Sequence, residues 1–98
     1  AILNKIQPTD IQFLDEGDDY YTVSWKGVSN AFGYTLKIQK TRDDGTVEEE
    51  IIRQKTSAET NHGISMQGYK SVKITIIVKG NGEYYFDSEE TSKVFEKL

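Results

Sequence analysis

The 98-residue chain is predicted to adopt an all-β fold, a seven-stranded antiparallel β-sandwich. Three observations lead to this prediction. Apolar and polar residues alternate at period two in several short runs, as they do in strands that are buried on one face only. Residues typical of turns separate these runs. The run at 21–25 ends in the only tryptophan and faces the aromatic-aliphatic run at 34–38, which is how a small sandwich fills its centre.

The first two predicted strands lie in the N-terminal quarter of the chain. Ile11 and Phe13 alternate with polar residues after Pro8, whose missing N–H suits a strand start or a sheet edge. The acidic segment 15–19 is predicted as a loop, and it leads into the strand at 21–25.

The next three strands are separated by clear turn signals. A strand is predicted at 31–38, and Asp44-Gly45 is a strong hairpin signal after it. The returning strand at 46–54 is more polar and contains three consecutive glutamates, which discourage pairing with another chain. After a loop at 57–61, a short strand is expected at 64–66.

The C-terminal third contains the clearest strand. In the run 72–78 every even position is apolar, which predicts a central strand, and a Gly-Asn-Gly turn follows at 80–82. The tail 88–98 allows two interpretations. It could be a capped helix with an apolar face, or a closing strand. We favour the strand, because the run 72–78 needs a partner in the sheet.

Composition narrows the classes of function. The net charge of −4 argues against nucleic acid as a partner, and no run approaches the roughly 18 apolar residues that insertion into a membrane requires. The absence of cysteine excludes disulfides and thiolate metal sites. Ten lysines against two arginines, with ten isoleucines, suggest a bacterial source. Because the first residue is not methionine, we expect residues 1–98 to be a single domain excised from a larger multidomain protein.

The order and spacing of these motifs resemble the fibronectin type III family, in the form found in bacterial extracellular proteins. The resemblance covers nearly the whole chain and implies a fibronectin type III or immunoglobulin-like sandwich. The matching features are Pro8 before the first strand, Trp25 at the end of the second, Tyr34-x-Leu36-x-Ile38, Val72-x-Ile74-x-Ile76-x-Val78, the turn at 80–82 and Tyr85-Phe86-Asp87-Ser88. One position departs from the pattern, since Val72 stands where the family usually has a tyrosine and Tyr69 lies three residues earlier.

Catalytic and metal-binding residues are not evident in the sequence. Nucleophilic catalysis needs an activated Ser or Cys beside a base, and the only histidine, His62, is interpreted as an exposed turn residue. The acids of segment 15–19 supply hard oxygen ligands of the kind calcium prefers, but their spacing is not that of an EF-hand. We interpret this segment as a solvated acidic turn, and we expect no metal, no cofactor and no enzymatic activity.

Aromatic residues give the candidate binding surface. Phe13, Tyr21, Trp25 and Tyr34 fall on inward-facing positions and are assigned to the core. Tyr20, Phe32 and the rings of Tyr84, Tyr85 and Phe86 cannot all face inward under strict alternation. Exposed rings can stack on sugars or anchor a protein partner. The candidate partner-binding residues are therefore Phe32, Tyr84, Tyr85 and Phe86, with the folding of one ring over the end of the sandwich as the alternative.

These observations favour a non-catalytic module of a bacterial secreted or cell-surface protein. Its expected role is to space, orient or stabilise the neighbouring domains of the same chain. The alternatives are a recognition module that binds a protein or a glycan through loop aromatics, and an accessory domain of a glycoside hydrolase.

Overall fold

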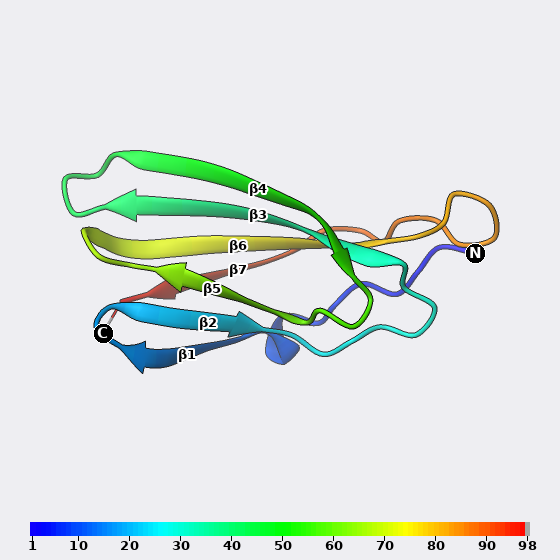
Figure 1. Ribbon diagram of the computed structural model, residues 1–98. Helices are drawn as coiled ribbons and strands as arrows, with labels where there is room; N and C mark the ends of the chain where they lie inside the picture. The colour runs from blue at the N-terminus through cyan, green and yellow to red at the C-terminus, as the bar shows by residue number, and fades with distance from the viewer. Residues whose placement is uncertain (98) are drawn as a thin grey trace.

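The computed structural model describes residues 1–97, and for residues 54 and 55 it describes the backbone alone. Seven strands form two antiparallel sheets, one of three strands in the order β1-β2-β5 and one of four in the order β4-β3-β6-β7 (Figure 1). A short 3-10 turn, Pro8–Asp10, precedes them. The strands are β1 (Gln12–Gly17), β2 (Tyr20–Ser24), β3 (Gly33–Arg42), β4 (Val47–Thr56), β5 (Asn61–Ser65), β6 (Tyr69–Lys79) and β7 (Thr91–Glu96).

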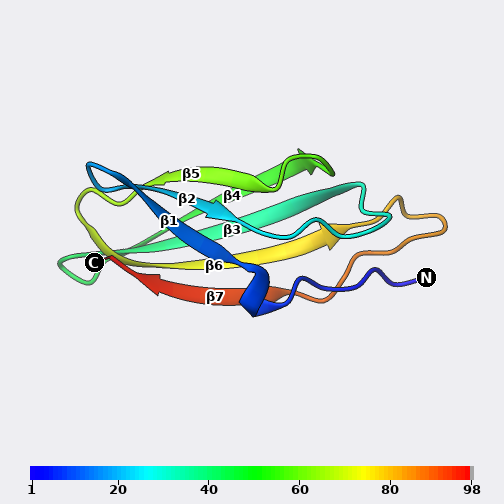
Figure 2. The same ribbon diagram turned by 90° about the horizontal axis from the view of Figure 1, so that it is seen from below.

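The two sheets lie face to face, as in a β-sandwich, and enclose one apolar core (Figure 2). The predicted all-β fold with two antiparallel sheets is therefore confirmed. The molecule is elongated, with dimensions of 44 × 23 × 20 Å, because the strands run roughly along its long axis. Within residues 1–97, no helix is long or apolar enough to cross a membrane.

Strand β6 is one of the two central strands of the four-stranded sheet, as its alternation predicts. It pairs with β3 on one side and β7 on the other, and its even positions from 72 to 78 are buried. The predicted closing strand is also confirmed, since β7 pairs with β6 in a register that sets Thr91 opposite Ile76. The tail is a strand because β6 would otherwise leave a row of unpaired backbone groups.

Trp25 is buried in the core, as predicted. Its side chain is 5% exposed and meets the fully buried ring of Tyr34 edge-on, with 5.5 Å between the ring centroids. The phenolic oxygen of Tyr34 accepts a hydrogen bond from the backbone N–H of Val28 at 3.1 Å. The polar end of this buried ring is therefore satisfied, and the ring also fixes the start of the β2–β3 connection.

A stack of three rings closes the side of the sandwich between β1 and β7. Phe13 lies nearly parallel to Tyr21 at 4.5 Å on one side and to Phe95 at 4.8 Å on the other. Phe13 and Tyr21 belong to the three-stranded sheet, whereas Phe95 belongs to the four-stranded sheet. The stack therefore links the two sheets through apolar contact, and it accounts for the partial burial of Phe13 and Phe95.

The acidic segment 15–19 is mostly strand rather than the predicted loop. Strand β1 continues to Gly17, and a two-residue turn, Asp18-Asp19, with φ values of 54° and 61° joins it to β2. Positive φ at both central residues gives the turn whose twist matches that of paired strands, and Asp tolerates it better than most residues. The Asp44-Gly45 hairpin is confirmed, with Gly45 at φ 93°.

Candidate functional site

The predicted ring residues lie at one end of the molecule, which we call the loop pole: residues 1–3 and the loop 80–87 that joins β6 to β7 (Figure 1). The amide oxygen of Asn81 organises this loop. It accepts hydrogen bonds from the backbone N–H groups of Glu83, Tyr84 and Tyr85 at 2.9, 3.1 and 3.0 Å. The three aromatic residues that follow the turn are thus held on a hydrogen-bonded support.

The far end of the loop is fixed by Asp87. Its carboxylate accepts hydrogen bonds from the Lys79 ammonium and from the backbone N–H of Gly80. These bonds favour the ionised form, so the Lys79 ammonium first, and then the Gly80 amide, lower the pKa of Asp87. Gly80 itself is required here, because a Cβ at this position would stand 2.2 Å from the carbonyl oxygen of Tyr85.

The three rings of the loop have different environments. Tyr84 is 76% exposed and Phe86 is 48% exposed, whereas Tyr85 is partly buried and packs against the core. The prediction that at least one ring points away from the core is therefore confirmed. Tyr85 instead folds over the end of the sandwich, which was the alternative considered from the sequence.

Phe32 adjoins the same pole from the β2–β3 connection. Its backbone N–H donates to the carbonyl oxygen of Lys79 at 2.8 Å, and its ring is 60% exposed. Ile2 adds an apolar side chain that the sequence did not point to, because a parallel bridge pairs it with Phe86. The loop pole therefore presents Ile2, Tyr84 and Phe86 to solvent, with Phe32 beside it.

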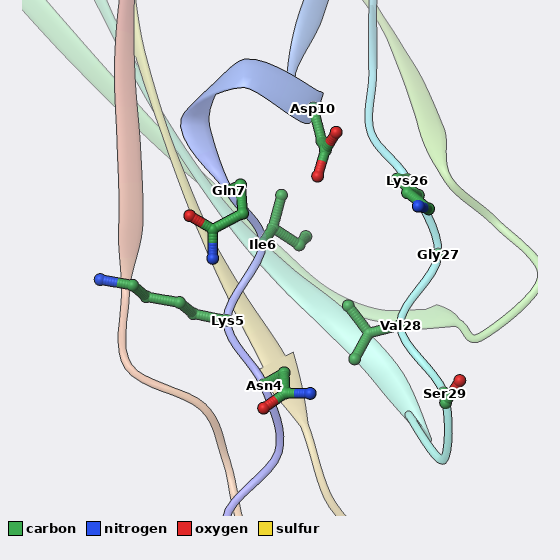
Figure 3. Close-up of a pocket in the computed structure, with 9 residues that line it drawn as sticks. All are labelled: Asn4, Lys5, Ile6, Gln7, Asp10, Lys26, Gly27, Val28 and Ser29. Atoms are coloured by element: carbon green, nitrogen blue, oxygen red, sulfur yellow. The ribbon is translucent and has the colours of Figure 1, made fainter.

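A separate cleft of about 410 Å³ lies along the side of the molecule between the N-terminal segment and the β2–β3 connection (Figure 3). Ile6 and Val28 face each other across it, and polar side chains surround this apolar floor. The described residues around the cleft include no aromatic ring. The polar lining residues are Asn4, Lys5, Gln7, Asp10, Lys26 and Ser29. The cleft has the size of a small-molecule site, but it lacks a stacking platform for a sugar.

A second hollow, of about 420 Å³, lies on the outer surface of the four-stranded sheet. Phe32 borders it, together with Ile77 on β6 and Arg53 on β4. Sequence reasoning missed this hollow, because Ile77 interrupts the alternation of 72–78 and was not recognised as an outward residue. An apolar residue at an odd position of that strand is the signal that could have revealed it.

The residues considered as catalytic or metal-binding candidates do not form a site in the described part of the chain. His62 lies in β5, opposite Val23, so its interpretation as a turn residue was wrong. Asp15 accepts a hydrogen bond from the N–H of Gly17, and Asp19 lies 3.8 Å from the ammonium of Lys97. Among the described residues, no three His, Asp or Glu side chains are grouped in a way that could hold a metal ion.

The comparisons with known proteins give no further identification. The chain matches no protein-family model, and no curated protein matches it. The function is therefore argued from the fold and these surfaces alone.

Proposed function

We propose that the chain is a non-catalytic β-sandwich module that sets the distance and orientation between neighbouring domains of a larger protein. One observation carries this proposal. Residues 1–3 lie at the loop pole, and the end of β7 lies at the opposite end of a molecule that is 44 Å long (Figures 1 and 2). Domains attached at these two points are held apart by the length of the sandwich.

Both ends are tied to the body of the sandwich, as a rigid spacer requires. At the loop pole, the N–H of Leu3 donates to the carbonyl oxygen of Phe86 at 3.0 Å. At the opposite pole, the backbone N–H of Lys97 donates to the carbonyl oxygen of Lys70 at 2.9 Å. The ammonium of Lys97 donates to the carbonyl oxygen of Met66 at 3.2 Å. These hydrogen bonds fix the direction of the backbone at both ends of the described chain.

The strand order supports a sandwich of the fibronectin type III or immunoglobulin-like type. Strand β5 pairs with β2, whereas β3 and β4 between them belong to the other sheet, so the chain crosses from one sheet to the other as in Greek-key sandwiches. Together with the sequence resemblance, this order favours a module of a bacterial secreted or surface-anchored protein.

The spacing role can be tested by placing the module between two rigid reporter domains and measuring the fusion by small-angle X-ray scattering. The matched control replaces the module with a Gly/Ser linker of 98 residues. We expect the module to give one well-defined separation that reflects its 44 Å length, and the control to give a broad distribution. Similar broad distributions from both fusions would contradict the spacing role.

The exposed rings of the loop pole support a second candidate, recognition of a protein or a glycan. Tyr84 and Phe86 are exposed on a loop whose backbone is fixed by Asn81, so a partner would meet preformed anchors. A double substitution, Tyr84→Ala with Phe86→Ala, tests this candidate. Loss of binding to a co-purified partner without loss of stability would favour recognition, and unchanged binding would exclude these rings.

A further inference from the structure

The outer face of the four-stranded sheet differs in charge from the rest of the chain. Its described charged side chains are the cations Lys37, Arg53, Lys73 and Lys79 and the carboxylates Glu49 and Glu96, which lie on the outward rows of their strands, and Asp87, which is bound to Lys79. Four positive and three negative charges leave a surplus of one positive charge on this face, whereas the whole chain has a net charge of −4. The face is therefore weakly basic, although the protein as a whole is acidic.

Within this face, the hollow beside Phe32 combines three kinds of chemistry. Phe32 and Ile77 provide apolar walls, and hydroxyl groups and two cations surround them. The polar and charged lining residues are Thr35, Thr56, Arg53 and Lys79. Its volume of about 420 Å³ lies within the range of sites that bind a ligand or a partner's side chain.

Arg53 is the cation that remains available in this hollow. The ammonium of Lys79 is occupied by the carboxylate of Asp87, and that of Lys37 lies 3.9 Å from Glu49. Arg53 has no hydrogen bond or ion pair with another described residue, and it is exposed. A guanidinium group binds a carboxylate through two parallel hydrogen bonds, which makes it suited to an acidic partner.

The apolar surface continues beyond the hollow. Ile51, on the outer row of β4, is 43% exposed, and Val94, on the outer row of β7, is 61% exposed. Lys37 and Lys73 lie between them on the central strands. A small anion would contact the hollow alone, whereas these residues extend the same combination of apolar and basic groups across the sheet. The face therefore fits an extended partner.

We propose that this face docks an acidic polypeptide segment of a partner protein, which places an apolar side chain between Phe32 and Ile77 and a carboxylate on Arg53. The complementary charge of such a segment is the feature that selects it. This interaction goes beyond the spacing role, and it stands whether or not the module acts as a spacer.

The test uses a blocked hexapeptide of alternating Glu and Leu as the probe, with the matched Lys and Leu peptide as the comparison. Backbone amide NMR spectra of the 98-residue protein are recorded during titration with each peptide. We expect the Glu peptide to shift the signals of Phe32, Arg53 and Ile77 and to bind at least about tenfold more tightly than the Lys peptide. Added salt should weaken its binding.

Two pairs of variants separate the proposed contacts from general effects. Arg53→Glu should weaken binding of the Glu peptide about tenfold or more, whereas Lys70→Glu, at an exposed position outside the face, should change it less than twofold. Phe32→Ala should weaken binding, whereas Leu14→Ala, which removes an exposed apolar side chain from the other sheet, should not. Unchanged NMR spectra at positions away from each substitution verify the fold.

Several results would overturn the proposal. These are equal or tighter binding of the Lys peptide, an absence of shifts on this face, or shifts confined to the cleft of Figure 3 or to the loop pole. Binding of a sulfated heparin fragment at the same residues, with no binding of the Glu peptide, would show that the occupant is a glycan. Concentration-dependent self-association through this face, seen by sedimentation, would show that the occupant is a second copy.

Discussion

Trp25 shows how one residue fixes the centre of the sandwich. It follows β2, its N–H donates to the carbonyl oxygen of Thr60 at 3.0 Å, and its ring contacts Tyr34 in the opposite sheet. Backbone pairing and side-chain packing therefore position the same residue. Its indole nitrogen is buried and has no hydrogen-bond partner among the described residues, so the ring contributes through packing alone.

We expect Trp25→Ala to lower the free energy of unfolding by about 3–5 kcal/mol, because it leaves a large cavity in the core. Trp25→Phe should cost less, since it keeps a ring in place and removes the unpaired N–H. Urea denaturation measures both changes. Equal losses for the two variants, or native tryptophan emission at a wavelength typical of exposed rings, would contradict the assignment.

Asp87 should contribute a pH-dependent part of the stability. The Lys79 ammonium and the Gly80 amide lower its pKa, so the ionised form is favoured in the folded state. The stabilisation is present above the pKa of the unfolded chain, about 3.9, and is lost as the pH falls through the lower folded value. We expect Asp87→Asn to lower the melting temperature at pH 7, and the difference from the unsubstituted protein to shrink in acid. A difference that is independent of pH would contradict this account.

At the scale of elements, the loop 80–87 is held by side-chain hydrogen bonds rather than by strand pairing. Asn81→Ala removes the acceptor of three backbone hydrogen bonds, and we expect it to lower the free energy of unfolding by about 1–2 kcal/mol. Hydrogen exchange at the amides of residues 83–85 should accelerate, while exchange in β6 away from the loop changes less. Unchanged protection of these amides would show that the loop does not depend on Asn81.

The rings of this loop should contribute to stability to different extents. Tyr85→Ala should destabilise the protein by about 2 kcal/mol or more, because this ring packs against the core. Tyr84→Ala should change the stability by less than about 0.5 kcal/mol, because this ring is 76% exposed. Thermal unfolding of the two variants gives the comparison, and similar losses for both would place Tyr84 in the fold as well.

Most of the elements could be predicted because one face of each strand is buried. Alternation located β2, β3 and β6 and favoured the closing strand β7, since a buried face requires a regular pattern. Strand β5 was placed too late, because His62 and Gly63 interrupt the alternation and resemble a turn.

The candidate surfaces were predicted less completely than the strands. The exposure of rings at the loop pole could be predicted, because successive residues of a strand point to opposite faces. Contacts between segments that are distant in the sequence leave no such local pattern. The bridge between Ile2 and Phe86 is one such contact. The hollow between Phe32, Arg53 and Ile77 is another, because its residues come from three segments that only the sheet brings together.

The molecule is an elongated sandwich, and the two ends of the described chain lie at its opposite poles. Its shape results from long strands that run along one axis, and both ends are hydrogen-bonded to the body. Because the chain contains no cysteine, two cysteines can be introduced for labelling without competing thiols.

The most direct test is a distance measurement by pulsed electron spin resonance between spin labels at Ile2→Cys and Glu96→Cys. Both positions are exposed, and they lie at the two poles. We expect a narrow distribution at a distance comparable to the 44 Å length of the molecule. A broad distribution, or one centred near the 20–23 Å width of the sandwich, would contradict it.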